Sequence, residues 1–131
     1  MCKIEHLAIW VNNLEKMQAF YVKYFNAERN QKYTNPKKQF ESYFISLGGG
    51  GARIELMRKP GIAPNNGLNN QTIGLAHIAI TVGDEAAVNA LTERLRADGY
   101  TIAGEPRHTG DGYYESAVLD PEGNYLELTA E

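Results

Sequence analysis

The chain contains two similar halves, and this internal repeat limits the folds it can adopt more than any other feature. Residues 6–11 read HLAIWV, and residues 77–82 read HIAITV. Later in each half, the triplet IEL at 54–56 recurs as LEL at 126–128, at almost the same offset. Similarity at a fixed spacing is the signature of a repeated structural unit. Each half is therefore expected to fold in the same way.

Each half is predicted to run strand, helix and then several strands. Short runs rich in Ile, Val and Leu predict strands, and apolar residues at helical spacing behind an Asn or Asp cap predict helices. The turn DPEG at 120–123 closes the last hairpin. The expected strands are 4–11, 28–34, 40–47, 52–57, 75–82, 100–104, 113–119 and 124–129; the expected helices are about 14–25 behind Asn12 or Asn13, and one between the cap Asp84 and the stop Gly99.

A segment rich in Gly, Asn and Pro separates the two halves. Such a composition is typical of a loop. We expect a single domain over 1–131, with module one at about 1–59, a linker at about 60–72 and module two at about 73–131.

Composition excludes several classes of protein. The 131 residues include one cysteine, Cys2, so no internal disulfide can form and a reducing cytoplasm is the expected location. No apolar run is long enough to cross a membrane. The net charge of −3 is unfavourable for non-specific binding to nucleic acid. We expect a cytoplasmic protein whose partner is a small molecule, with no nucleic acid and no membrane partner.

Histidine occurs only at positions 6, 77 and 108, and two of these positions are equivalent in the repeat. Each is matched by an equivalent glutamate, Glu55 or Glu127. A single His on a strand is more often structural than a ligand, so the interpretation depends on this pairing. Imidazole and carboxylate together suit a divalent metal, and two carboxylates neutralise its charge. We interpret His6, Glu55, His77 and Glu127 as ligands to one divalent ion per site, zinc or nickel first, with cobalt, manganese or iron as alternatives.

The segment 6–11 and the ending DPEGNYLEL at 120–128 resemble the vicinal oxygen chelate superfamily, and within it the bacterial glyoxalase I (lactoylglutathione lyase) type. The resemblance spans essentially the whole chain. It implies an α+β fold in which two βαβββ modules form a curved mixed sheet, the glyoxalase/bleomycin resistance/dioxygenase fold. It also implies a homodimer in which each site takes ligands from both subunits.

The ligand set His-Glu-His-Glu is the one that bacterial glyoxalase I uses. The resemblance therefore implies a lyase or isomerase that acts on a 2-oxoaldehyde–thiol adduct by proton transfer through an ene-diolate. Glu127 and its counterpart Glu55 are then the catalytic carboxylates. Two alternatives remain: an acyl-CoA epimerase-type enzyme on the same fold, and a metal-free protein that binds an antibiotic or another small molecule.

The chain departs from glyoxalase I at Trp10, where that enzyme carries an Arg that contacts glutathione. His108 lies in a Gly-rich segment that is expected to be a surface loop, and Tyr43 is expected to occupy the strand position equivalent to Glu115. The residues expected to line a substrate pocket are Trp10, Arg53, Tyr43, Glu115 and Tyr125.

Overall fold

The chain divides into two compact units in the computed structural model, which describes residues 1–67 and 70–131. Unit 1 is Met1–Pro64 and unit 2 is Asn65–Glu131. The expected linker at 60–72 contains residues 68 and 69, which lie outside the described residues. In the two described ranges, no helix has the length and apolar character needed to span a membrane.

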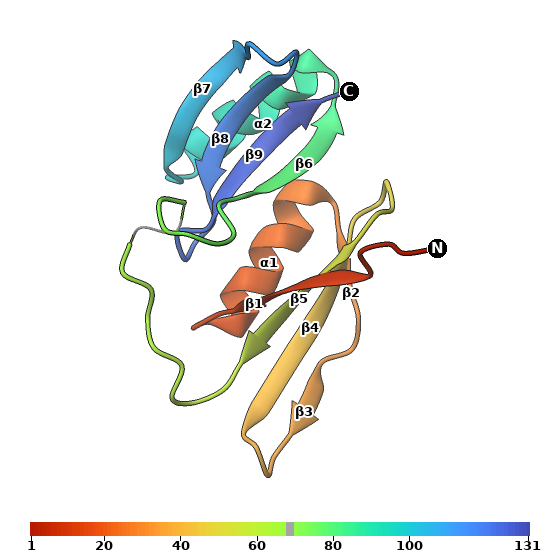
Figure 1. Cartoon of the computed structure of the whole chain (residues 1–131), viewed down its shortest axis with the longest axis vertical. Helices are drawn as coiled ribbons and strands as arrows, with labels where there is room; N and C mark the ends of the chain where they lie inside the picture. The colour runs from red at the N-terminus through yellow and green to blue at the C-terminus, as the bar shows by residue number, and fades with distance from the viewer. Residues whose placement is uncertain (68–69) are drawn as a thin grey trace. The chain divides into compact units, whose positions relative to one another are not determined.

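Unit 1 consists of one helix and one mixed sheet (Figure 1). In this sheet β5 lies between β1 and β4, and β2 and β3 both pair with β4. The pairing of β1 with β5 is parallel, and the other pairings are antiparallel. Its elements are β1 (His6–Trp10), α1 (Leu14–Phe25), β2 (Glu28–Arg29), β3 (Tyr33–Asn35), β4 (Phe40–Ser46) and β5 (Arg53–Arg58).

Unit 2 repeats this plan with a four-stranded sheet in the order β6-β9-β8-β7. Again the first and last strands of the unit, β6 and β9, pair in parallel. The expected α+β fold of two βαβββ modules is confirmed: the described residues form two helices and nine strands in two mixed sheets. The elements of unit 2 are β6 (Ile78–Gly83), α2 (Glu85–Ala97), β7 (Ile102–His108), β8 (Tyr114–Leu119) and β9 (Tyr125–Ala130).

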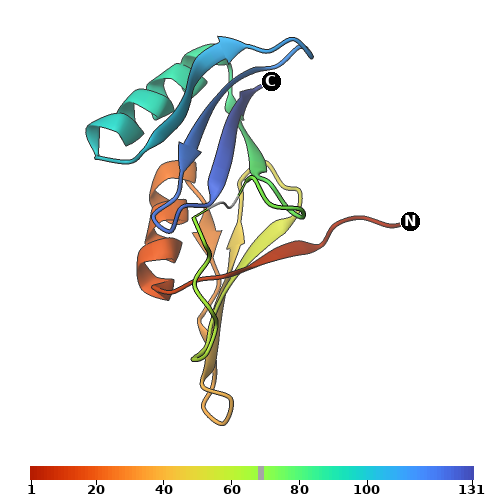
Figure 2. The same cartoon turned by 60° about the vertical axis from the view of Figure 1, so that its left-hand side comes forward.

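Each helix begins at the expected cap and covers one face of its own sheet, as Figures 1 and 2 show together. The Asn13 side chain accepts a hydrogen bond from the Lys16 amide, and the Asp84 side chain accepts one from the Ala87 amide. Both caps satisfy backbone donors that the first helical turn leaves free. The buried faces of the helices pack on apolar strand residues and leave the opposite face of each sheet for polar chemistry.

Two strands depart from their expected bounds in ways that have identifiable reasons, and the others differ by a few residues at their ends. The strand expected at 28–34 is split into β2 and β3, because the side chain of Asn30 accepts a hydrogen bond from the Phe44 amide and interrupts regular pairing. The strand expected at 100–104 is β7, which runs from 102 to 108 with two register shifts. Gly104 and Pro106 predict a strand end, but β7 pairs with β8 alone, and an edge strand tolerates both residues.

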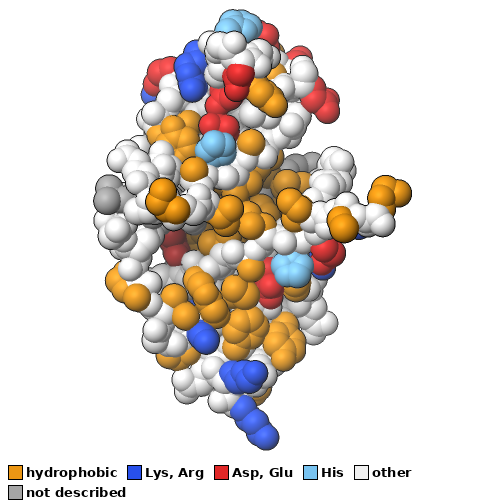
Figure 3. Space-filling model, viewed as in Figure 1, with side chains coloured by type: hydrophobic (Ala, Val, Ile, Leu, Met, Phe, Trp, Pro, Cys, Tyr) orange, Lys and Arg blue, Asp and Glu red, His pale blue; other side chains and the backbone are white. Residues whose placement is uncertain are grey.

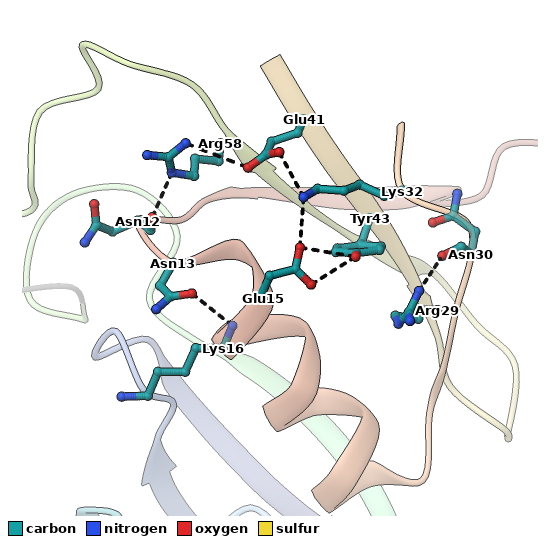
Figure 4. A network of polar contacts seen from close by, with 10 residues as sticks. All are labelled: Asn12, Asn13, Glu15, Lys16, Arg29, Asn30, Lys32, Glu41, Tyr43 and Arg58. Atoms are coloured by element: carbon teal, nitrogen blue, oxygen red, sulfur yellow. Dashed lines mark hydrogen bonds and ion pairs between the residues drawn. The ribbon is translucent and has the colours of Figure 1, made fainter. Parts of the chain in front are cut away.

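A polar network joins the start of α1 to β4 and β5 (Figure 4). Lys32 Nζ lies 2.9 Å from Glu15 Oε2 and 3.0 Å from Glu41 Oε2. The Tyr43 hydroxyl donates to the Glu15 carboxylate over 3.0 Å, and Arg58 Nε donates to the Asn12 carbonyl over 3.0 Å. The network fixes α1 against the sheet that carries the candidate site of unit 1.

The Lys32 network predicts a pH-dependent stability difference. The hydrogen bond from Lys32 lowers the pKa of Glu15, so the stabilisation is present above the ordinary carboxyl pKa and is lost as pH falls through the lowered value. We expect Lys32→Met to lower the free energy of unfolding by less than about 1 kcal/mol near pH 7, because Glu15 is largely exposed. The difference should shrink toward zero near pH 2 in urea titrations. A difference that grows toward acid would contradict this assignment.

Candidate metal and substrate site

The two parallel pairings that hold the candidate ligands have the same register. Ala8 of β1 lies opposite Glu55 of β5, and Ala79 of β6 lies opposite Glu127 of β9. Residues in register share a face of a sheet, and side chains two positions apart on one strand also share it. Each histidine lies two residues before its alanine, so each unit places a His and a Glu on one face. That face is the one that the unit's helix does not cover.

Within each unit the His and the Glu are neighbours. His6 Nε2 lies 3.6 Å from Glu55 Oε1, and His77 Nε2 lies 3.1 Å from Glu127 Oε1. The imidazoles are 39% and 40% exposed, and the carboxylates are 15% and 21% exposed. The two pairs thus match in residue type, in the atoms that face each other and in burial.

These pairs suit a metal ion by their chemistry and by their spacing. Where nitrogen and oxygen ligands lie ~2.0–2.2 Å from one ion at angles of about 90–110°, the two donor atoms are roughly 2.8–3.5 Å apart. The spacing in unit 2 falls in this range, and the spacing in unit 1 lies just above it. Among the described residues, no group of three or more His, Cys, Asp or Glu side chains is arranged to hold a metal. The structure therefore brings the four predicted ligands together in pairs, one in each unit.

The turn at 120–123 positions Glu127. The buried Asp120 carboxylate accepts hydrogen bonds from the amides of Glu122 and Asn124, both over 2.9 Å, and from the Asn124 side chain over 2.8 Å. Gly123 has a φ of 87°, a conformation that favours glycine. This turn fixes the β8–β9 register, in which Ala117 lies opposite Glu127. The turn at 120–123 therefore determines the face of the sheet on which the Glu127 carboxylate lies.

Three side chains surround His6. The His6 and Phe44 rings pack in a T-shaped arrangement with centroids 5.2 Å apart, and the Arg53 guanidinium lies over the Phe44 ring at 4.1 Å. Arg53 shares the face of Glu55 and forms its ion pair with Glu5. The hydrogen bonds from Arg53 and His6 lower the pKa of the Glu5 carboxyl to about 2. Glu5 and Phe44 are not among the site residues predicted from the sequence; the register that places Phe44 opposite Glu55 is the signal that identifies Phe44.

A second carboxyl group lies beside Glu127. Glu115 is 6% exposed and lies on the same face of the sheet as Glu127. Burial first, and then the neighbouring carboxyl group of Glu127, raises the pKa of Glu115. The Tyr125 ring lies 6.3 Å from the His77 ring between centroids. Glu115 and Tyr125 therefore lie beside the His77–Glu127 pair.

Tyr43 lies on the opposite face of its sheet, and its expected equivalence with Glu115 is wrong. Phe44 is the residue opposite Glu55, so Tyr43 shares the helix-covered face with Leu56 and bonds to α1. By register its counterpart in unit 2 is Ser116, which shares a 2.7 Å hydrogen bond with Thr92 of α2. A shift of one residue reverses the face of a strand position.

The open face of unit 1 continues from the ligand pair into an aromatic group. Trp10 contacts Phe40 edge-on at 6.3 Å, and Phe40 contacts Tyr33 at 6.0 Å. Met57 lies opposite Trp10, and Lys59 Nζ lies 5.2 Å from the Trp10 ring centroid. Hydrophobic side chains gather over this unit in the lower half of Figure 3. Trp10 is 41% exposed.

His108 was expected in a surface loop, but it is the last residue of β7. It lies opposite Tyr114, and the two rings are 4.8 Å apart. Its Nε2 lies 3.8 Å from Glu85 Oε1, and its side chain is 73% exposed. Among the described residues, these contacts of His108 involve neither ligand pair.

The chain is similar to known proteins over nearly its whole length. A protein of Bacillus subtilis (strain 168), the uncharacterized protein YqjT, is 26% identical over 97% of this chain and 98% of its own length. Glyoxalase I of Leishmania major, described as trypanothione-dependent, is 25% identical with a TM-score of 0.79, covering 100% of this chain and 88% of that one.

A glyoxalase/bleomycin resistance protein/dioxygenase domain from Frankia sp. EAN1pec superposes with a TM-score of 0.83 at 18% identity, over 99% of this chain and 92% of that chain, and so shows the fold. The family model of the Glyoxalase/Bleomycin resistance protein/Dioxygenase superfamily matches residues 3–128. Nearly the whole chain is covered by this match, and the chain therefore belongs to the Glyoxalase/Bleomycin resistance protein/Dioxygenase superfamily.

Proposed function

We propose that the protein is a metal-dependent lyase or isomerase of the glyoxalase I type, acting on the adduct of a 2-oxoaldehyde and a thiol. One observation carries this proposal: a His–Glu pair recurs in both units at the same register, with Nε2 facing a carboxylate oxygen each time. We propose that His6, Glu55, His77 and Glu127 together bind one divalent ion, zinc or nickel.

The proposed reaction moves a proton between neighbouring carbons. A bound divalent ion would polarise the two adjacent oxygens of the adduct and stabilise the charge of the ene-diolate. Glu127 takes the proton from the carbon that bears the hydroxyl group and the sulfur, and returns it to the former ketone carbon, while the hydroxyl proton passes to the former ketone oxygen. Glu55 is its counterpart in unit 1. The half-buried position of both carboxylates limits access of water to the transferred proton.

Assembly and location are part of the proposal. We propose a homodimer in which each site takes one His–Glu pair from each subunit, in the cytoplasm, where thiols are abundant and the exposed Cys2 stays reduced. The position at which glutathione-dependent relatives carry an Arg holds Trp10, so a thiol other than glutathione fits the chain better. The similarity to the trypanothione-dependent glyoxalase I of Leishmania major supports the reaction class.

Metal content and turnover of the purified protein test this proposal. The native chain and His77→Ala are compared for bound zinc and nickel, and then for conversion of methylglyoxal with several thiols. About one ion per chain in the native protein, lost in the variant together with turnover, supports the four-ligand site. Proton exchange of an acyl-CoA in deuterated water without adduct turnover would favour the epimerase alternative. Ligand binding with no metal at all would favour the binding protein.

Trp10 predicts a preference for aldehydes with an aromatic group. Its counterpart in unit 2 is Thr81, so Trp10→Thr replaces the aromatic ring by the residue that the repeat itself supplies. A stacked aromatic contact contributes about 1 kcal/mol beyond area burial. We expect kcat/KM for the phenylglyoxal adduct to fall roughly fivefold relative to the methylglyoxal adduct. Trp10→Phe, which keeps a ring, should retain the preference, and an unchanged ratio in Trp10→Thr would exclude the contact.

A further inference from the structure

The two proposed histidine ligands differ in what lies behind them. His6 Nδ1 lies 2.9 Å from Glu5 Oε1, on the side of the ring away from Glu55. Arg53 holds the same carboxylate with two hydrogen bonds, from Nε to Oε2 over 2.9 Å and from Nη2 to Oε1 over 2.5 Å. The three side chains form a chain of contacts that ends on the imidazole.

Unit 2 lacks this arrangement although it repeats the rest of the site. Ala76 precedes His77 where Glu5 precedes His6, and Tyr125 stands where Arg53 stands. In the part of the chain that the structure describes, the recorded partners of His77 are Glu127 and the ring of Tyr125. The repeat thus provides an internal comparison between a supported and an unsupported histidine.

A neutral imidazole carries its proton on one nitrogen only, and the hydrogen bond of the other nitrogen decides which one binds a metal. A carboxylate that accepts from Nδ1 keeps the proton there and leaves the Nε2 lone pair free. In unit 1 that lone pair then faces the carboxylate of Glu55 at 3.6 Å, and a cation between the two acceptor atoms would be favourable. Without Glu5, the Nε2–H form could donate to Glu55 and occupy the ligand atom.

We propose that Glu5, clamped by Arg53, is a positioning residue that holds His6 in the Nδ1–H form with Nε2 directed at the metal. The inference rests on the proposed metal site, but its first consequence is present in the metal-free protein. His6 is then the preorganised ligand and His77 the adaptable one.

The tautomer of His6 provides the primary test. Long-range proton–nitrogen NMR spectra of the metal-free full chain at pH 8, where imidazole is ordinarily neutral, distinguish Nδ1–H from Nε2–H. We expect the Nδ1–H form at His6 in the native protein and a shift toward Nε2–H in Glu5→Ala, with His77 unchanged. An identical His6 spectrum in both proteins would overturn the proposal.

Zinc affinity, measured by competition with a chromophoric chelator, provides the second readout. Removal of a residue that supports a metal ligand typically costs 10–100-fold in affinity, so we expect the dissociation constant of zinc to rise at least tenfold in Glu5→Ala. Arg53→Lys, which keeps the charge but not the two-pronged contact, should fall between the native protein and Glu5→Ala. A changed His6 tautomer with unchanged zinc affinity in Glu5→Ala would show that Glu5 does not support His6 as a metal ligand.

The matched control is Glu105→Gln. Glu105 forms an ion pair with Arg96, another exposed Arg–carboxylate contact, but this one has no histidine attached. Glu105→Gln should leave the His6 tautomer and the zinc affinity unchanged. Equal effects of Glu105→Gln and Glu5→Ala would mean that Glu5 acts only as a surface ion-pair partner. If the native chain takes up no zinc, the proposed function fails, while the tautomer still decides whether Glu5 positions His6.

Discussion

Glu127→Gln is expected to reduce kcat for the aldehyde–thiol adduct by about 10³ while leaving the fold intact. A positioned general base typically contributes 10²–10⁴ to the rate. The amide has nearly the shape of the carboxylate and keeps an oxygen for the metal, but it cannot accept the proton. The substitution therefore separates the catalytic role of Glu127 from its role as a ligand. The measurement is kcat at saturating zinc, with the metal content determined on the same sample.

Two further variants make the result specific. Glu131→Gln removes another carboxylate near the C-terminus, at an exposed position with no place in the proposed site, and should keep native turnover. Glu55→Gln should reduce kcat as well, because Glu55 is the counterpart of Glu127 at the same register. A Glu127→Gln protein that turns over within fivefold of native would assign the proton transfer to another group.

The repeat made the fold predictable, because it fixed both the order of the elements and the face that each His and Glu occupies. The pattern H-x-A-I-x-V predicts a strand with alternating faces, and β1 has that alternation, with exposed positions separated by half-buried ones. The caps Asn13 and Asp84 were predicted from local chemistry that does not depend on tertiary context. These caps are present in the structure because their hydrogen bonds lie within the first helical turn and do not depend on packing in the core.

Residues that depend on pairing between strands could not be placed in the same way. Tyr43 and Glu115 share an offset that matches the Glu repeat, yet the β4–β5 and β8–β9 registers set them on opposite faces. The two hairpins differ in loop length, and one extra residue reverses a face. The sequence offset therefore predicted the wrong face for Tyr43, although Glu115 lies on the face of Glu127.

Glu5 was missed for a different reason. It lies before the strand and is exposed, which in sequence is typical of a solvated terminus. Only the position of Arg53, which is remote in sequence and lies opposite His6 in the β1–β5 pairing, gives Glu5 a partner and an orientation. Contacts between side chains that are far apart in sequence are what the structure adds to a site whose main residues a repeat already reveals.

Leu128→Ala is expected to lower the free energy of unfolding by about 3 kcal/mol, because removing buried leucine atoms typically costs 2–5 kcal/mol through lost burial and a residual cavity. Leu128 is fully buried on β9, next to Glu127 but on the helix-covered face. Leu56 is its counterpart beside Glu55 and is equally buried, so Leu56→Ala should have a similar effect. Urea unfolding followed by circular dichroism, with a chelator present, measures both, since bound metal would add to stability.

Leu75→Ala is the matched control, because that side chain is 75% exposed and lies just before β6. Surface substitutions of this kind usually change stability by less than about 0.5 kcal/mol. The side chain of Leu128 anchors the strand from which Glu127 projects, so Leu128→Ala should also loosen the His77–Glu127 pair and weaken zinc binding more than Leu75→Ala does. A loss below about 1 kcal/mol in Leu128→Ala would mean that α2 and β9 do not form the packed core that directs Glu127 to the open face.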